Sequence, residues 1–278
     1  MGEFVRADAF ITLNLVQPLR KLFPTKGRRV PILMYHSISD REERGHPYFR
    51  TVTSPGAFEW QMRYLHENGY VAVRIGEALE YLDGRRELQG QPVVITFDDG
   101  YADFQSAAYP VLARYGFTAI VYLPTAFIGE TGGRFKDCAC LTWNQVRELH
   151  GLGIEFGSHT VNHPKLVELP AKAVEEEVRQ SKEMIEQEIG AAVTSFAYPY
   201  AFPETKRYFT AMLRGMLKGA GYESGTCTVI GVASEWDDGL FLKRLPINGL
   251  DDGSLMGAKL GGGYDWLGGL QYAKKLIA

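Results

Sequence analysis

Short apolar runs alternate with helical patterns along most of this 278-residue chain. Five of these runs are bounded by glycine, proline or charged residues and are typical of strands: 30–35, 93–97, 118–123, 154–156 and 193–198. Apolar residues recur at helical spacing in the segments between them. Strand–helix alternation of this kind predicts parallel strands joined by crossover helices, and therefore an α/β sheet or barrel.

The helical segments have recognisable first and last residues. Ser54 before Pro55 is typical of an N-cap and first turn, and the helical pattern that follows runs to Asn68-Gly69. Three more helices are expected to end at a glycine, because glycine favours the left-handed conformation after a last turn: 102–115 at Gly116, 142–150 at Gly151 and 171–189 at Gly190.

Length and composition favour one catalytic domain. A chain of this size with 45% apolar residues can bury a large core, and α/β barrels of similar length are commonly single domains. We place the domain at 29–278 and treat 1–28 as an N-terminal extension. Within the extension, residues 10–22 show near-helical apolar spacing and predict a short amphipathic helix that packs on the domain.

Several classes of protein are disfavoured by composition. The formal charge of −3 and the absence of a long Lys/Arg block argue against nucleic acid as a partner. No apolar run is long enough to span a bilayer. The N-terminus lacks the basic and apolar regions of a signal peptide, so the cytoplasm is expected over export. Three cysteines argue against a disulfide framework, and Cys138-Ala139-Cys140 is interpreted as small residues in a loop.

Two carboxylates, Asp98 and Asp99, directly follow the apolar run 93–97. Neighbouring side chains of a strand point to opposite faces, so one pocket can use both acids only where the strand breaks into a loop, as Gly100 indicates. In parallel barrels the working groups lie where strands end. An Asp-Asp-Gly sequence by itself is more often a turn, in which an aspartate side chain bonds to the backbone.

Two histidines follow another expected strand, 154–156. His159 and His163 are spaced like neighbours on a helix, but Pro164 disfavours helix at His163, so we expect a loop with a single turn. Two histidines and one carboxylate form a three-ligand set that leaves positions open on a zinc-like ion. Neither motif is specific alone, but together, both at strand ends, they favour a metal site.

The remaining histidines and two tyrosines carry weaker signals. His36 follows the strand-like run 33–35 and by itself is more often a structural residue. Tyr198 and Tyr200 flank a proline at a strand end, where lining a groove and filling a core are about equally common. Three histidines in a polar loop or on helices are interpreted as surface or packing residues: His46, His66 and His150.

The two motifs resemble those of polysaccharide deacetylases of carbohydrate esterase family 4. The sequence TFDDG at 96–100 is similar to the family's first motif and HTVNH at 159–163 to its second, and the resemblance runs from about residue 30 to at least residue 245. It implies a distorted (β/α) barrel, usually with seven strands. It also implies Asp98 as general base. Asp99, His159 and His163 become ligands of a divalent metal, with zinc expected and cobalt, nickel or iron as alternatives.

Two expected motifs are missing from their usual places. The family's third motif begins with an arginine, which 196–200 lacks, and no histidine follows His163 to serve as the general acid of the last motif. The first and last strands of a barrel are neighbours, so a strand can move between the termini and keep its place. LMYH at 33–36 can then supply the acid. This order resembles the family's circularly permuted branch, typified by poly-β-1,6-N-acetylglucosamine deacetylases.

The resemblance assigns three further roles. His36 is the expected general acid, because an imidazole can donate a proton near neutral pH. The main-chain N–H of Tyr200, carried over from the third motif, is expected to bind the tetrahedral oxyanion together with the metal. Arg244, near an expected strand end at 243–247, is either the substitute for the missing arginine or a surface cation.

The expected reaction is hydrolysis of N-acetyl groups on N-acetylglucosamine-containing polysaccharide or oligosaccharide. Metal-activated water attacks the acetamide, and Asp98 takes its proton. Two alternatives stay open at this point. One is a deacylase or deformylase of a small or lipid-linked amino sugar, and the other is a non-catalytic carbohydrate-binding protein on the same fold. A carbohydrate is the expected partner in all three cases, and the sequence gives no oligomeric state.

Overall fold

The computed structural model describes residues 6–23, 25–43, 50–247 and 249–277, and seven parallel strands in it close into a barrel. Around the ring the order is β2 (Ile32–Tyr35), β14 (Leu242–Pro246), β12 (Ser224–Ile230), β11 (Ser195–Ala197), β10 (Glu155–Ser158), β7 (Ile120–Leu123) and β6 (Gln91–Phe97). The barrel closes because β2 also pairs with β6. The predicted α/β class and the seven-stranded barrel are confirmed.

The first barrel strand lies between the last one and β6. Leu33 of β2 pairs with Leu245 of β14 on one side and with Ile95 of β6 on the other. The residue after β2 therefore lies beside the residues that follow β6. A short strand, β5 (Tyr70–Ala72), extends the sheet beyond β6 in the same direction.

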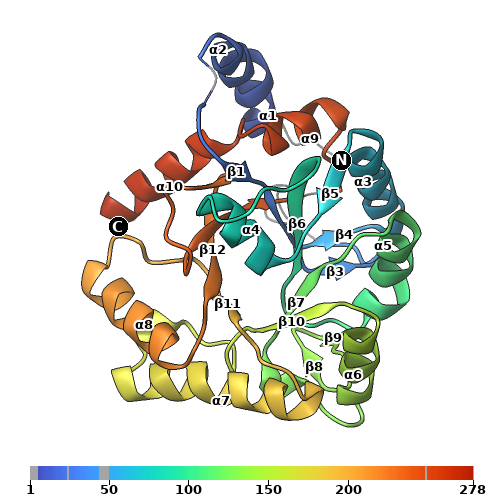
Figure 1. Ribbon diagram of the computed structural model, residues 1–278, viewed down its shortest axis with the longest axis vertical. Coiled ribbons are helices and arrows are strands. Elements are labelled where there is room, and N and C mark those ends of the chain that lie inside the picture. The colour runs from blue at the N-terminus through green and yellow to red at the C-terminus, as the bar shows by residue number, and fades with distance from the viewer. Residues whose placement is uncertain (1–5, 24, 44–49, 248, 278) are drawn as a thin grey trace.

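Helices surround the barrel on its outer side (Figure 1). They are α3 (Pro55–Glu67), α5 (Tyr109–Tyr115), α6 (Trp143–Gly151), α7 (Ala171–Ile189), α8 (Arg207–Gly219), α9 (Gly253–Leu260) and α10 (Asp265–Ile277), while α4 (Ile75–Leu82) lies across one end of the barrel. A π-helical turn, η3 (Phe104–Ala108), leads into α5. Near the N-terminus α1 (Ala7–Ile11), η1 (Thr12–Val16) and α2 (Gln17–Leu22) follow one another, and η1 packs against α9.

Most of the expected helix ends are confirmed. The Ser54 side chain accepts the N–H of Ala57 at the start of α3, and Gly116 and Gly190 are left-handed at the ends of α5 and α7. The expectation for Gly151 is wrong. It is the last residue of α6, and the left-handed residue is Gly153, with φ 93°, because the second of two nearby glycines makes the turn.

The strands bury alternate residues inside the barrel. Residues at the starts of three strands, Ile32, Ile120 and Leu242, pack together there with side chains of α4. In Figure 1 α4 lies across the centre of the ring, so it closes the end at which the strands begin. Two residues further along β7 and β14, the same inward face presents the buried side chains Tyr122 and Arg244. The barrel interior thus changes from apolar to polar toward the strand ends.

Two smaller points concern the expectations from composition. Cys138 belongs to β9 (Cys138–Ala139), which pairs antiparallel with β8 (Arg134–Phe135), so the predicted loop is a hairpin. Cys138, Cys140 and Cys227 are free cysteines. Among the helices of the described ranges, none combines the length and hydropathy that crossing a bilayer would require.

Candidate metal centre

The two acids follow β6 where the strand ends. Asp98 continues the inward alternation of Val94 and Thr96, so its carboxylate points into the barrel mouth. Asp99 would then point outward, but its φ of 71° is left-handed and turns the chain. Both residues are buried, and the break in the strand that the sequence indicated is present.

Asp99, His159 and His163 converge on one another. The Nε2 atoms of the two histidines lie 3.7 Å and 3.3 Å from Oδ1 of Asp99, in that order. The three ligand atoms that such a group can offer all lie within 4.8 Å of one another. This Oδ1 is buried and has no hydrogen-bond donor among the described residues. A buried, unsatisfied carboxylate oxygen facing two imidazole nitrogens is a donor set that fits a divalent metal ion.

The tautomer of one histidine follows from its other nitrogen. Nδ1 of His159 lies 2.8 Å from the carbonyl oxygen of Ala197 in β11, and only a protonated nitrogen can donate to a carbonyl. Nε2 of His159 therefore keeps its lone pair, which points toward Asp99. A hydrogen bond from the ring nitrogen that does not face the metal is the usual way in which a protein orients a metal-binding imidazole.

The loop that carries the histidines is held by its own side chains and by α7. Thr160 and His163 have φ values of 70° and 52°, and the N–H of His163 donates to Thr160 Oγ1. Glu177 of α7 accepts the main-chain N–H groups of Val161 and Asn162 at 2.8 Å and 2.9 Å. The segment is a loop, as Pro164 predicted.

The electrostatics of the group suit metal binding. Burial lowers the pKa of His159, opposed in part by Asp98 and Asp99. Burial and the neighbouring His159 lower the pKa of His163 to about 3. Burial alone would raise the pKa of Asp99, but the positive charges around it outweigh burial and the net shift is downward. At neutral pH the histidines are neutral and the carboxylate is ionised, which are the metal-binding forms.

Asp98 is paired with a different partner. Arg244 of β14 donates two hydrogen bonds to its carboxylate, Nη1 to Oδ1 at 2.6 Å and Nη2 to Oδ2 at 2.7 Å. Its Nε donates to the carbonyl of Cys227, so the guanidinium is fixed in the barrel interior. Arg244 is 1% exposed, and the alternative that it is a surface cation is wrong. Burial raises the pKa of Asp98, but Arg244 outweighs it and the net shift is downward.

His36 lies on the other side of Asp98. It continues the inward alternation of Ile32 and Met34 in β2, and its Nε2 is 4.0 Å from Oδ2 of Asp98. The side chain is half-buried and lines a cavity of about 220 Å³ together with Thr228 and Gln271. The N-terminal strand therefore brings a histidine to the acids, as the permuted order requires.

The two tyrosines after β11 have different environments. Tyr198 is buried and packs edge-on against Phe202, so it fills the core. Tyr200 is 45% exposed, and its ring lies 4.6 Å from that of His163. Its φ is 58°, and Thr228 Oγ1 donates to its carbonyl. No hydrogen bond found among the described residues uses the N–H of Tyr200, which stays available to a ligand.

The structure adds two partners of Asp99 that the sequence did not reveal. The Tyr101 hydroxyl donates to Oδ2 at 3.0 Å, and Lys136 Nζ lies 3.2 Å from the same oxygen. Lys136 stands at the turn between β8 and β9, with φ 48°, and no motif marks it in the sequence. Tyr101 directly follows TFDDG, and this position next to the motif is the one feature of the sequence that could have marked it as a site residue.

The other histidines lie away from the centre where they are described. His66 is exposed on α3 beside the ring of Tyr115, and His150 lies in the last turn of α6. His46 lies outside the described residues.

Comparison with known proteins identifies relatives of the whole fold. A family described as polysaccharide deacetylase matches residues 85–223. A Bacillus subtilis (strain 168) protein, YxkH, named as a polysaccharide deacetylase, is 34% identical over 234 residues, which are 84% of this chain and 76% of that protein. The poly-β-1,6-N-acetyl-D-glucosamine N-deacetylase of Escherichia coli (strain K12) is 32% identical over 140 residues, 47% of this chain and 20% of that protein.

Solved structures agree with the fold. The Streptococcus pyogenes deacetylase PplD superposes with a TM-score of 0.74 at 24% identity, covering 84% of this chain and 99% of that one. IcaB from Ammonifex degensii superposes with a TM-score of 0.69 at 23% identity, covering 85% and 98%. At these identities the likeness concerns the barrel alone.

Proposed function

The chain belongs to the polysaccharide deacetylase family and is a carbohydrate N-deacetylase, and from this premise we propose that it removes N-acetyl groups from N-acetylglucosamine units with the help of a bound metal. One observation carries the proposal. The group Asp99, His159 and His163 lies beside a second carboxylate, Asp98, which Arg244 holds apart from it. One acid is thus available to a metal and the other to a proton.

Asp99, His159 and His163 would hold the ion, and we propose zinc because this mixed nitrogen and oxygen set is common for it. When bound, the metal supplies Lewis-acid polarisation of the acetamide carbonyl and acidifies water. The two imidazoles and the carboxylate need no change of protonation to accept it, since burial already keeps the histidines neutral.

Asp98 would act as the general base. Its ionised carboxylate can accept a proton from the attacking water, and the two hydrogen bonds from Arg244 fix its orientation. The same hydrogen bonds stabilise the charged form, because a bidentate guanidinium favours the carboxylate over the acid. Arg244 is in this way a positioning residue for the base.

Two groups would serve the tetrahedral intermediate. The N–H of Tyr200 would donate to the oxyanion. Thr228 Oγ1 donates to the carbonyl of Tyr200 and holds the turn, with φ 58°, that presents this N–H. His36 would protonate the amine as the C–N bond breaks, since an amide nitrogen leaves poorly without a proton. Its Nε2 lies 4.0 Å from Oδ2 of Asp98, and this proximity supports an acid and a base that act at the same barrel mouth.

The substrate we propose is a polymer or oligomer of N-acetylglucosamine, with β-1,6 linkage as the first candidate. The relatives of Escherichia coli and Staphylococcus aureus are named as deacetylases of this polymer. The N-terminal strand that carries His36 lies between the last barrel strand and β6, the order expected for the permuted branch that such enzymes typify. Because the chain matches only 20% of the Escherichia coli protein, that protein's substrate comes here as a proposal.

Acetate release tests the function directly. The metal-loaded protein should release acetate from N-acetylglucosamine oligomers, and a panel of β-1,6- and β-1,4-linked chains of several lengths should reveal the linkage. Release from a monosaccharide or a lipid-linked amino sugar alone would replace the polymer with a small substrate. Binding of sugar and metal without any acetate would show a non-catalytic protein.

His36→Ala tests the acid. This variant should keep its metal, while kcat on an N-acetylated oligomer falls by roughly 10²- to 10⁴-fold, the usual effect of a lost general acid. An activated ester has a better leaving group, so its hydrolysis should suffer much less. An equal loss on both substrates would mean that His36 has a structural role.

A further inference from the structure

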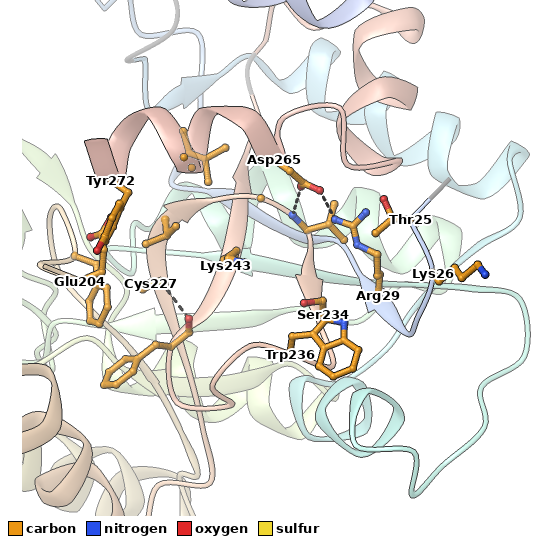
Figure 2. A pocket seen from close by; sticks show the side chains of 18 residues that line it. Thr25, Lys26, Arg29, Glu204, Cys227, Ser234, Trp236, Lys243, Asp265 and Tyr272 are labelled. Atoms are coloured by element: carbon orange, nitrogen blue, oxygen red, sulfur yellow. Dashed lines mark hydrogen bonds and ion pairs between the residues drawn. The ribbon is translucent and has the colours of Figure 1, made fainter. Parts of the chain in front are cut away.

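A second hollow lies on the outer face of β12 (Figure 2). Its volume is about 490 Å³, and none of the metal-centre residues lines it. The chain passes from β12 to β14 through the short strand β13 (Ala233–Ser234) and not through a helix. In the place of a crossover helix, α10, the segment 25–29 and residues of the loops after β11 and β13 surround this part of the barrel wall and leave a space between them.

Aromatic side chains stand at both ends of this hollow. Figure 2 shows Trp236 at one end and Tyr272 of α10 at the other. Trp236 is 83% exposed and Tyr272 is 40% exposed, and Phe202 and Phe241 also belong to the lining. Exposed rings of this kind combine an apolar face with a polar edge, and they suit ligands that are apolar on one face and polar at their rim.

Most charged side chains of the hollow are paired within the protein; Lys26 has no ion pair among the described residues, but it is exposed, and Figure 2 shows it at the edge of the hollow, pointing away from the other lining side chains. Lys243 Nζ lies 2.7 Å from Asp237, and Glu204 lies 2.6 Å from Lys275. Arg29 is paired with Asp265, as a dashed line in Figure 2 marks. Because these three side chains already have partners, the part of the hollow between the aromatic rings and away from Lys26 offers little net charge to a ligand. It therefore favours a neutral ligand over an acidic peptide or an anionic lipid.

Two consecutive glycines of α10 have different reasons to be glycine. A Cβ on Gly268 would lie 2.4 Å from the carbonyl oxygen of Ile230, so close packing on β12 excludes any side chain there. A Cβ on Gly269 would meet nothing within 4 Å. Glycine inside a helix costs about 0.5–1 kcal/mol relative to alanine. Packing does not explain Gly269, and its effect is to leave the hollow open.

The hollow adjoins the cavity beside His36. Ile230, the last residue of β12, lines both spaces. Helix α10 presents Gln271 to the cavity at His36 and Tyr272 to the outer hollow. The two spaces are therefore neighbours, separated by the buried Ile230 and by Gln271, whose Oε1 accepts the N–H of Ile230 at 2.9 Å. A sugar chain long enough to pass over this point would reach both.

We propose that this hollow is a second glycan site, which binds a neutral, still N-acetylated segment of the substrate chain away from the unit that is hydrolysed. The ligand class is an uncharged N-acetylhexosamine oligomer, stacked on Trp236 and Tyr272. This inference rests on the proposed function for its ligand. The site would make the enzyme prefer long, acetylated chains over short or already deacetylated ones.

The test uses two variants with matched controls. Trp236→Ala removes an exposed ring, and Tyr208→Ala removes one of similar exposure, 86%, on α8. Gly269→Leu fills the hollow, and Gly215→Leu adds the same side chain to α8, where a Cβ also meets nothing within 4 Å. KM and kcat are measured for a long N-acetylglucosamine polymer and for the disaccharide. Binding of a neutral pentamer and of its fully deacetylated form is measured by titration calorimetry.

Trp236→Ala and Gly269→Leu should raise KM for the polymer by up to about tenfold, the equivalent of one aromatic contact, with kcat and the disaccharide unaffected. The two controls should behave like the unmodified enzyme. The glycan site would be overturned if all four variants had the polymer KM of the unmodified enzyme, or if the deacetylated pentamer bound as tightly as the acetylated one. Acetate release fails on every substrate if the proposed function is wrong, whereas the pentamer titration still reports whether Trp236 binds sugar.

Discussion

Two buried ion pairs in this protein look alike but have different surroundings. Arg244 pairs with Asp98 at the barrel mouth, and Lys259 of α9 pairs with Asp251 outside the barrel wall at 2.5 Å. All four side chains are at most 3% exposed. Each pair also fixes a main-chain carbonyl, because Arg244 donates to Cys227 and Lys259 donates to Pro246.

The neighbours of the two acids differ. Asp251 also meets Arg6, and Lys259 lies 4.5 Å from the centre of the Tyr264 ring, so this pair ties the N-terminal helical segment and α9 to the end of β14. Asp98 lies beside His36 and next to a carboxylate whose buried Oδ1 has no donor among the described residues. Burial of charge therefore does not identify a reaction centre. The reaction centre is indicated instead by a buried ligand atom, Oδ1 of Asp99, that has no hydrogen-bond donor among the described residues.

Asp98→Asn should have the largest effect on activity. The amide cannot accept the proton of the attacking water, so kcat should fall by roughly 10²- to 10⁴-fold while the metal stays bound. His163→Ala, in contrast, should lose metal affinity first. Metal content by elemental analysis and acetate release measured on the same samples separate the two effects. If Asp98→Asn stripped the metal and Asp99→Asn retained it, the two roles would be reversed.

The sequence predicted those parts of the fold and of the candidate site that depend on local sequence pattern. The helical and strand periods up to residue 198 predicted a parallel sheet or barrel, and the resemblance carried by TFDDG and HTVNH implied the seven-stranded barrel. β12 was missed because its sequence, SGTCTVI, has no apolar run. Two of its residues explain this: Thr226 is buried in the polar part of the barrel, and Gly225 is excluded from carrying a side chain by the carbonyl of Leu240, 2.3 Å from a Cβ.

Contacts made only by the fold could not be predicted. Lys136 contacts Asp99 from the turn of the β8–β9 hairpin, and Glu177 of α7 accepts hydrogen bonds from the loop that carries the histidines. Neither residue belongs to a motif, so nothing local marks it. Arg244 was a candidate only because the usual arginine was absent, and its burial decides between the two alternatives. The cytoplasmic location and the domain boundary at residue 28 stay predictions, because no feature of the fold bears on them.

Lys259→Met should affect stability as strongly as Asp98→Asn affects turnover. The change leaves Asp251 buried without its ammonium partner, and breaking a buried pair in this way costs about 3–5 kcal/mol of unfolding free energy. The activity of the folded fraction should not change, because the pair lies outside the barrel. Denaturant titration gives the stability and initial rates give the activity. A loss of kcat without a loss of stability would contradict the assignment.

Removing the metal should lower the free energy of unfolding by less than Lys259→Met does. An ion that binds only the native state adds RT ln(1 + [L]/Kd), about 2.7 kcal/mol at a concentration one hundredfold above Kd. Chelation should therefore lower the melting temperature of the unmodified protein and of Lys259→Met alike, and should leave His163→Ala unaffected. A chelator effect that persists in His163→Ala would mean that the ion binds elsewhere.

Lys136 offers the smallest and sharpest test, because it is the exposed counterpart of the buried Arg244. Its side chain is 48% exposed and its ammonium lies 3.2 Å from Oδ2 of Asp99, which we propose as a metal ligand. A cation there repels the ion that Asp99 would bind, but exposed pairs are worth only about 0–1 kcal/mol. Lys136→Met should therefore tighten zinc binding by up to about fivefold, and less at high salt.

The control for this change is Arg179→Met, which removes a cation of similar exposure, 49%, paired with Glu183 on α7. Zinc affinity, measured by competition with a chromophoric chelator, should not change in that variant. Lys136→Arg should keep the affinity of the unmodified protein, because the charge is retained. Weaker zinc binding in Lys136→Met would show that the ammonium orients Asp99 toward the metal and does not compete with it. The hairpin would then hold a metal ligand in place, as Arg244 holds the base.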